Sequence, residues 1–135
     1  MARMRTLTQH VKIVSIDLGT LTTGASATYV DTQGYRGAAV LYNITTAGGA
    51  TFDSKVQKCA TSGGSYSDIT GAAIVQVPAS QTRAAPSVNI WLDKHLQFLK
   101  LAHTVTGTVT GSVLVLLFDP IQMPVSQTIA AVETT

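Results

Sequence analysis

Residues 112–118 (SVLVLLF) constrain the fold of this chain more than any other stretch, because they are apolar on both faces of an extended strand. Alternate side chains of a strand point to opposite faces. One face would carry Val113, Val115 and Leu117, and the other Leu114, Leu116 and Phe118. A strand of this kind has to be covered on both sides, by a second sheet and by something else. What provides the second cover is the first question about function.

The same strand is predicted to be half of a long β-hairpin. Residues 95–120 contain two apolar runs joined by the Thr/Gly segment 107–111, the pattern of two paired strands and a turn. Asp119 and Pro120 should end the second strand, because proline has no N–H to donate to a neighbouring strand. We take this hairpin as the centre of the fold.

The composition indicates an all-β protein. Thr and Val are abundant, and their β-branched side chains favour strands over helices. About eight short apolar runs recur at intervals of roughly ten residues, separated by Gly-containing breaks, with no long helical pattern. The predicted fold is an antiparallel two-sheet β-sandwich, either jelly-roll or immunoglobulin-like.

Several runs allow local predictions. Residues 51–61 have one half-polar face, which indicates a strand near the rim of a sheet. Residues 66–70 and 72–77 are predicted to be two separate strands, and residues 79–86 a loop. Residues 87–92 are predicted to be a strand with Val88, Ile90 and Leu92 on one face and Trp91 on the other.

The chain divides into three parts by composition. Residues 1–10 are predicted to be a flexible basic arm, residues 11–119 the sandwich domain, and residues 120–135 an extended tail. In the tail, Ile121, Met123 and Val125 alternate with Gln122, Pro124 and Ser126. Such a tail could fold back as an edge strand or pair with a neighbouring chain.

Charge is scarce. Only 12% of residues are charged, about half the usual share. A weakly charged surface can pack against neighbours, whereas a solvated monomer normally carries more charge. Arg3, Arg5 and Lys12 make the N-terminal arm basic, but three charges without aromatic residues between them do not favour nucleic-acid binding. The chain has no signal-peptide pattern and no apolar run long enough to span a membrane.

No catalytic or metal-binding pattern is visible, so we predict a protein that is not an enzyme and has no cofactor. His95 and His103 share a strand face but would lie about 26 Å apart, too far to bind one metal ion. Cys59 is the sole cysteine and is predicted to be a buried free thiol. Asp93 and His95 could form an ion pair at the surface. Nucleophile-elbow, P-loop and dinucleotide-binding motifs are absent from the sequence.

The order of features resembles a known group of proteins. The segments TYVDTQGYRGAAVLYNI, TFDSKVQKCATSGGSYSDITGA and LDKHLQFLKLAHTVTGTVTGSVLVLLFDP are similar to those of small structural proteins of tailed bacteriophages. The D-x-x-G-Y turn that leads into an apolar strand is carried by residues 31–35. The F-x-D-I segment is carried by residues 66–69, with Tyr66 in place of Phe. The likeness extends over most of residues 13–120.

The resemblance implies a virion component, most similar to a capsid decoration (cement) protein. Such proteins are made in the host cytoplasm, bind the major capsid protein on the outside of the shell, and form homo-oligomers, with a trimer favoured here over a dimer. The alternatives are a tail or head–tail connector component, and a carbohydrate- or receptor-binding sandwich. The residues predicted to contact a sister subunit or the capsid are Val113, Val115, Leu117, Ile121, Met123, Val125, Arg3 and Arg5.

Overall fold

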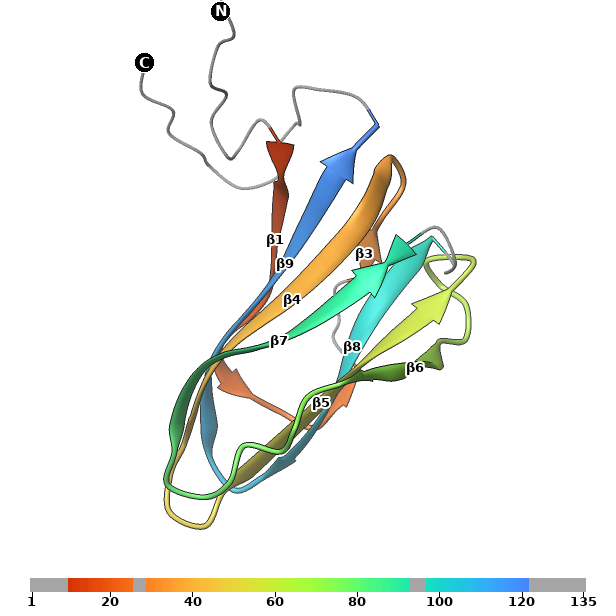
Figure 1. Cartoon of the computed structure of the whole chain (residues 1–135). Helices are drawn as coiled ribbons and strands as arrows, with labels where there is room; N and C mark the ends of the chain where they lie inside the picture. The colour runs from red at the N-terminus through yellow and green to blue at the C-terminus, as the bar shows by residue number, and fades with distance from the viewer. Residues whose placement is uncertain (1–9, 26–28, 93–96, 122–135) are drawn as a thin grey trace, which may run out of the picture.

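Two antiparallel β-sheets face each other across one apolar core in the computed structural model (Figure 1). The structure describes residues 10–25, 29–92 and 97–121, with only the backbone described for residues 82–87. The described strands are β1 (Lys12–Leu21), β2 (Gly24–Ala25), β3 (Val30–Asp31), β4 (Tyr35–Thr46), β5 (Thr51–Cys59), β6 (Ser67–Ala73), β7 (Thr82–Trp91), β8 (Phe98–Thr106) and β9 (Val109–Pro120). The all-β sandwich predicted from the sequence is confirmed.

The strand order is that of a jelly roll. Sheet A has the order β1-β9-β4-β7, and sheet B has the order β2-β8-β5-β6, with β3 also paired to β8. β2 and β3 lie along the same neighbour, since Gly24 is opposite His103 and Val30 is opposite Leu99. The chain therefore moves repeatedly between the two sheets, as in double-sheet jelly rolls.

The predicted hairpin of residues 95–120 is wrong. β8 pairs with β5 in sheet B, whereas β9 pairs with β1 and β4 in sheet A. The connection crosses from one sheet to the other at Gly107, which has φ +76° and sits so close to Ala50 that an added Cβ would lie 2.9 Å from the Cβ of Ala50. The backbone N–H of Ala47 donates to the carbonyl of Thr108 at 3.2 Å. Two of the connections between the sheets, β4–β5 and β8–β9, thus pack together at one end of the sandwich.

β9 lies in the middle of sheet A, and its inner face forms much of the core. Val113, Val115 and Leu117 are at most 1% exposed, and they face apolar residues of sheet B. The prediction that these three side chains contact a partner is therefore wrong, because they are buried inside their own chain. Their neighbours Leu114, Leu116 and Phe118 lie on the outer face. The fully buried side chains that are largest are Tyr42, Phe52, Ile44, Leu99, Leu101 and Leu117.

Of the other local predictions, one is confirmed and the rest are wrong. The two faces of residues 87–92 are as predicted, with Val88, Ile90 and Leu92 buried and Trp91 exposed. β5 is a central strand between β8 and β6, so its half-polar face is an outer face and not a sign of the rim. One strand, β6, replaces the two predicted over residues 66–77. Residues 82–86, predicted to be part of a loop, belong to β7, whose Thr82 is opposite Thr45.

Residues 1–9 and 122–135 lie outside the described residues, and with them Arg3, Arg5, Met123 and Val125. Asp93 and His95 lie in the segment 93–96, which is also outside the described residues. Ile121 is described: its side chain is 62% exposed and its N–H donates to the carbonyl of Gly34 at 2.9 Å. No helix in the described part of the chain is long and apolar enough to cross a membrane.

Candidate functional site

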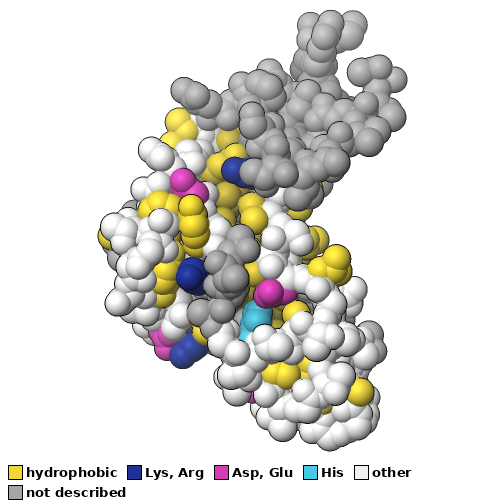
Figure 2. Space-filling view, turned by 180° about the vertical axis from the view of Figure 1, so that it is seen from behind, with side chains coloured by type: hydrophobic (Ala, Val, Ile, Leu, Met, Phe, Trp, Pro, Cys, Tyr) yellow, Lys and Arg dark blue, Asp and Glu magenta, His cyan; other side chains and the backbone are white. Residues whose placement is uncertain are grey.

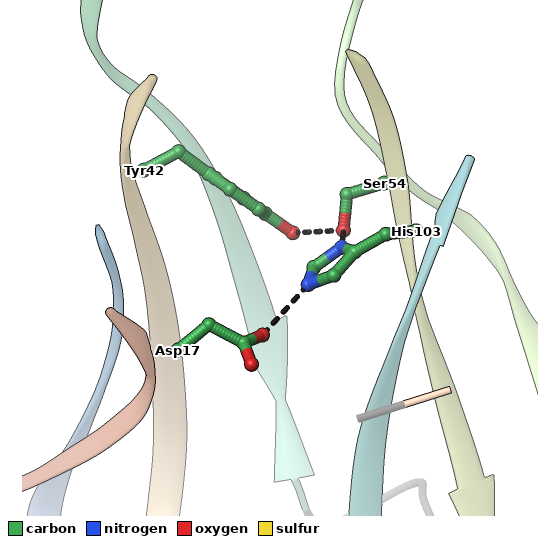
Figure 3. A network of polar contacts seen from close by, with 4 residues as sticks. All are labelled: Asp17, Tyr42, Ser54 and His103. Atoms are coloured by element: carbon green, nitrogen blue, oxygen red, sulfur yellow. Dashed lines mark hydrogen bonds and ion pairs between the residues drawn. The ribbon is translucent and has the colours of Figure 1, made fainter. Parts of the chain in front are cut away.

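Four polar side chains meet inside the sandwich, drawn from both sheets (Figure 3). Asp17 of β1 and Tyr42 of β4 come from sheet A, and Ser54 of β5 and His103 of β8 come from sheet B. Ser54 and His103 are opposite each other in the β5–β8 pairing, so their side chains point to the same face. This cluster is the candidate site among the residues that the structure describes.

A β-bulge explains how a carboxylate from an edge strand enters the core. Ser15 is opposite Leu114 on the outer face, but the register then shifts, and Asp17 is opposite the inward-pointing Val113. The extra residue, Ile16, is itself buried. Without the shift, Asp17 would share the outer face of Ser15, because side chains alternate along a strand.

The distances define a continuous chain of hydrogen bonds. His103 Nε2 lies 2.8 Å from Asp17 Oδ2, and His103 Nδ1 lies 2.9 Å from Ser54 Oγ. Ser54 Oγ in turn lies 2.9 Å from the hydroxyl of Tyr42. An ionised carboxylate can only accept, so we assign the proton of a neutral imidazole to Nε2. Nδ1 then accepts from Ser54, and Ser54 accepts from Tyr42, which leaves each donor with an acceptor.

The environment of Tyr42 keeps its hydroxyl protonated. Burial raises the pKa of Tyr42 to about 12, and the hydrogen bond with Ser54 partly offsets that rise. The negative charge of Asp17 adds to the increase in the pKa. The ring also packs edge-on against Phe52, with centroids 6.1 Å apart. The Tyr42 hydroxyl is thus a permanent hydrogen-bond donor to Ser54, and it is the first group in the hydrogen-bond chain.

The cluster contains a serine, a histidine and an aspartate, the residue types of a nucleophilic triad, but its arrangement differs. In such triads the carboxylate bonds Nδ1 and the serine bonds Nε2, whereas here Asp17 bonds Nε2 and Ser54 bonds Nδ1. Ser54 is 4% exposed, and its hydroxyl faces Tyr42 and His103 inside the sandwich (Figure 3). What this geometry does is join the two sheets through satisfied hydrogen bonds.

The sequence alone did not reveal this cluster. Asp17 and His103 are 86 residues apart in the chain, and the bulge that turns Asp17 inward has no signature in composition or spacing. The sequence pattern relates His103 only to His95, which shares its strand face. A weak signal existed, since a histidine between Ala102 and Thr104 on a buried strand needs hydrogen-bond partners.

Metal binding finds no support in the described residues, which contain no group of three or more His, Cys, Asp or Glu side chains close enough to hold an ion. Cys59 is a free thiol and is 6% exposed. Its sulfur lies 3.9 Å from the hydroxyl of Thr61. The predicted buried, free state of Cys59 is confirmed.

The outer face of sheet B is polar. Lys55 Nζ and Asp68 form an ion pair at 2.9 Å, and the Gln57 side-chain amide donates to the same carboxylate at 2.8 Å. The Gln76 amide donates to Asp53 at 2.8 Å. A shallow hollow of about 180 Å³ is lined by Asp53, Lys55 and Thr104 among other residues. This is the surface expected of a sheet that faces water.

The outer face of sheet A is different. Its apolar side chains are adjacent on neighbouring strands, because Leu114 is opposite Leu41, Leu116 is opposite Ala39, and Phe118 and Trp91 are both opposite Gly37. We call this surface the sheet A face, and it consists of Ala39, Leu41, Trp91, Leu114, Leu116 and Phe118. None of these residues is charged; Trp91 is 56% exposed and the other five are partly buried. Figure 2 shows apolar side chains together with scattered Lys or Arg and Asp or Glu side chains on the side of the molecule turned away from the view of Figure 1.

Comparison with known proteins adds little. No family model matches the chain, and no curated protein matches it in sequence. Among solved structures, the Eiger TNF from S. frugiperda is similar over 95% of this chain and 93% of its own, with 9% sequence identity and a TM-score of 0.36. At that identity and TM-score, the comparison shows neither a common family nor a common activity.

Proposed function

We propose that this chain is a structural subunit of a tailed-bacteriophage virion, which binds the major capsid protein on the outside of the assembled shell and stabilises it without catalysis. The observation that carries the proposal is the sheet A face, an uncharged apolar surface on a domain with few charges. A monomeric soluble domain rarely exposes a contiguous apolar patch larger than a few hundred Å², and larger patches mark interaction sites. The resemblance of most of residues 13–120 to phage structural proteins supports a virion as the assembly.

A subunit of this kind acts by mass action. A protein that binds the assembled shell better than separated capsid proteins shifts the equilibrium toward the shell. Each contact can be modest, because many copies act on one rigid lattice. A rigid sandwich with a satisfied interior, as formed by the Tyr42–Ser54–His103–Asp17 chain, suits such a passive role.

The test is the copy number of the chain in purified particles. Virions are isolated on a density gradient, and the chain is quantified by mass spectrometry relative to the major capsid protein. We expect a ratio of the same order as one to one, and we expect particles made without the chain to release their DNA at lower temperature. A handful of copies per particle would favour the tail or connector role, and absence from particles would overturn the proposal.

A second candidate, carbohydrate or receptor binding, is favoured by one observation. A hollow of about 150 Å³ lies between β6 and β7, and it is lined by Thr70, Asn89 and the exposed Trp91 among other residues. Aromatic rings beside amide and hydroxyl groups are suitable for binding sugars. Glycan binding that is lost in Trp91→Ala but kept in Tyr29→Ala, which removes another exposed aromatic ring, would support this function instead.

A further inference from the structure

We propose that the sheet A face is the contact between two copies of this chain, which pack face to face about a two-fold axis. The inference rests on the proposed role as a subunit of an assembly, and it names the surface and the partner. It also replaces the side chains Val113, Val115 and Leu117, which are buried in the core, with the opposite face of the same strand. A face that packs on its own copy closes at two subunits, in place of the trimer implied by the resemblance.

The outer side of sheet A as a whole is large enough for a stable dimer, with the sheet A face as its apolar centre. Sheet A has four strands, and its central strands β4 and β9 have 12 residues each. With strands about 4.8 Å apart and a rise of about 3.3 Å per residue, the whole outer side measures roughly 19 by 40 Å, or about 760 Å². Standard interfaces bury about 800 Å² on each partner. Sheets that pack face to face are a common arrangement in proteins.

The charge pattern favours a second copy over a charged partner. A two-fold axis brings identical surfaces together, so a charge on the face would meet a like charge. Neither β4 nor β9 places a charged side chain among the residues of the sheet A face, and the border residues Asn43, Asn89 and Ser112 are polar but neutral. An apolar centre with a neutral polar rim is the usual anatomy of an interface. The net charge of +2 causes little repulsion between copies.

The packing of Phe118 against Gly37 keeps its ring from projecting out of the sheet A face. The ring lies directly against Gly37, so closely that a Cβ on Gly37 would overlap its carbon atoms. The missing side chain lets the ring lie over the backbone of β4 instead of projecting from the sheet. Trp91 is the other neighbour of Gly37, on β7. Aromatic residues of this kind supply much of the binding energy in protein interfaces.

The experiment compares two lysine variants on opposite outer faces. Leu116→Lys places a charge in the centre of the sheet A face, and Thr104→Lys places one on β8 in sheet B, opposite Asp53. Sedimentation velocity is run on the purified full chain from about 1 to 100 µM. We expect wild type and Thr104→Lys to be dimers, and Leu116→Lys to dissociate with a Kd raised roughly 100-fold or more, because each desolvated charge is unpaired. Leu114→Lys is the second variant, and circular dichroism confirms that each variant folds.

The outcomes separate this inference from the proposed function. A wild-type monomer at every concentration, a trimer, or a folded Leu116→Lys and Leu114→Lys that both remain dimeric would overturn the two-fold contact. A dimer that dissociates only in the sheet A variants supports it, whether or not the chain is found in particles. A chain that is abundant in particles but monomeric in solution keeps the proposed function and overturns this inference.

Discussion

His103 is held by both of its ring nitrogens, and this fixes the position of two strands that belong to different sheets. Its side chain is 3% exposed, and that of Asp17 is 29% exposed, so the bonds are shielded from water to different degrees. Phe52 packs on the imidazole with ring centroids 5.0 Å apart. Polar groups buried in this way are costly unless every one is bonded. The cluster therefore specifies how the sheets face each other.

Ser54→Ala should destabilise the protein. The change removes the acceptor of the Tyr42 hydroxyl and the donor to His103 Nδ1, which leaves two buried groups without a partner. We expect a loss of about 1–3 kcal/mol in the free energy of unfolding. Urea denaturation of Ser54→Ala and of the exposed control Ser67→Ala measures it. Equal stability of the two variants would contradict the assigned hydrogen-bond chain.

Stability should also fall at alkaline pH through Tyr42. Its pKa is raised to about 12 in the folded protein from 10.0. Between these two values the unfolded state has lost the proton while the folded state keeps it, so the unfolded state binds fewer protons and stability falls as the pH rises. The loss reaches about 2 kcal/mol at the upper end.

Urea unfolding at pH 9 and pH 11.5 checks this, with Tyr42→Phe as the control. Burial also raises the pKa values of Tyr35 and Tyr66, so the difference between wild type and Tyr42→Phe isolates Tyr42. The variant should lose less stability over this range. Parallel losses in the two proteins would show that Tyr42 does not contribute.

At the residue scale, sequence reasoning succeeded where the neighbours in the chain decide the outcome. Trp91 alternates with Ile90 and Leu92, so its exposure could be predicted from its neighbours, whereas the burial of Cys59 is predicted from its residue type. The pairing of Asp17 with His103 could not, because it depends on a register shift in β1 and on contact between two sheets.

At the scale of elements, Gly111 of β9 lies close against the backbone of β4. A Cβ on this glycine would collide with the backbone carbonyl of Asn43, which cannot move without breaking the β4–β9 pairing. Gly111→Ala should therefore lower stability by about 2–4 kcal/mol, a range typical of strained or overpacked sites. Thermal unfolding is compared with Gly63→Ala, where an added Cβ meets nothing within 4 Å. A melting temperature equal to that of Gly63→Ala would contradict the close pairing.

Periodicity predicted most of the strands but not their partners. The alternation in residues 87–92 predicts correctly which face is buried, whereas in residues 112–118 it separates the two faces without indicating which of them lies in the core. The same alternation does not say which sheet a strand joins. β8 and β9 follow each other in sequence and fit a hairpin pattern, yet the corner at Gly107 sends them to different sheets, a choice made by contacts with Ala47 and Ala50.

At the scale of the whole molecule, the outer faces of the two sheets differ: that of sheet B is polar and carries an ion pair, and that of sheet A is apolar. When the net charge is small, electrostatic repulsion between copies of the chain is weak and does little to oppose association. The sequence pI is about 8.9, so light scattering at fixed concentration should be greatest near pH 9 and should decrease toward pH 6 as the chain becomes positive. Thr104→Lys adds a positive charge and should move the maximum to higher pH. A maximum at acid pH would contradict this expectation.

The central place of β9 has a consequence for how the protein is made. β1 begins at Lys12 and is opposite Leu117, about 100 residues later in the chain, and β9 is also the neighbour of β4. During translation, β1 has no partner in sheet A until β9 has left the ribosome. Pairing between such distant segments makes folding slow. We expect sheet A to form only after β9 has been made, so that subunits can associate only after that point.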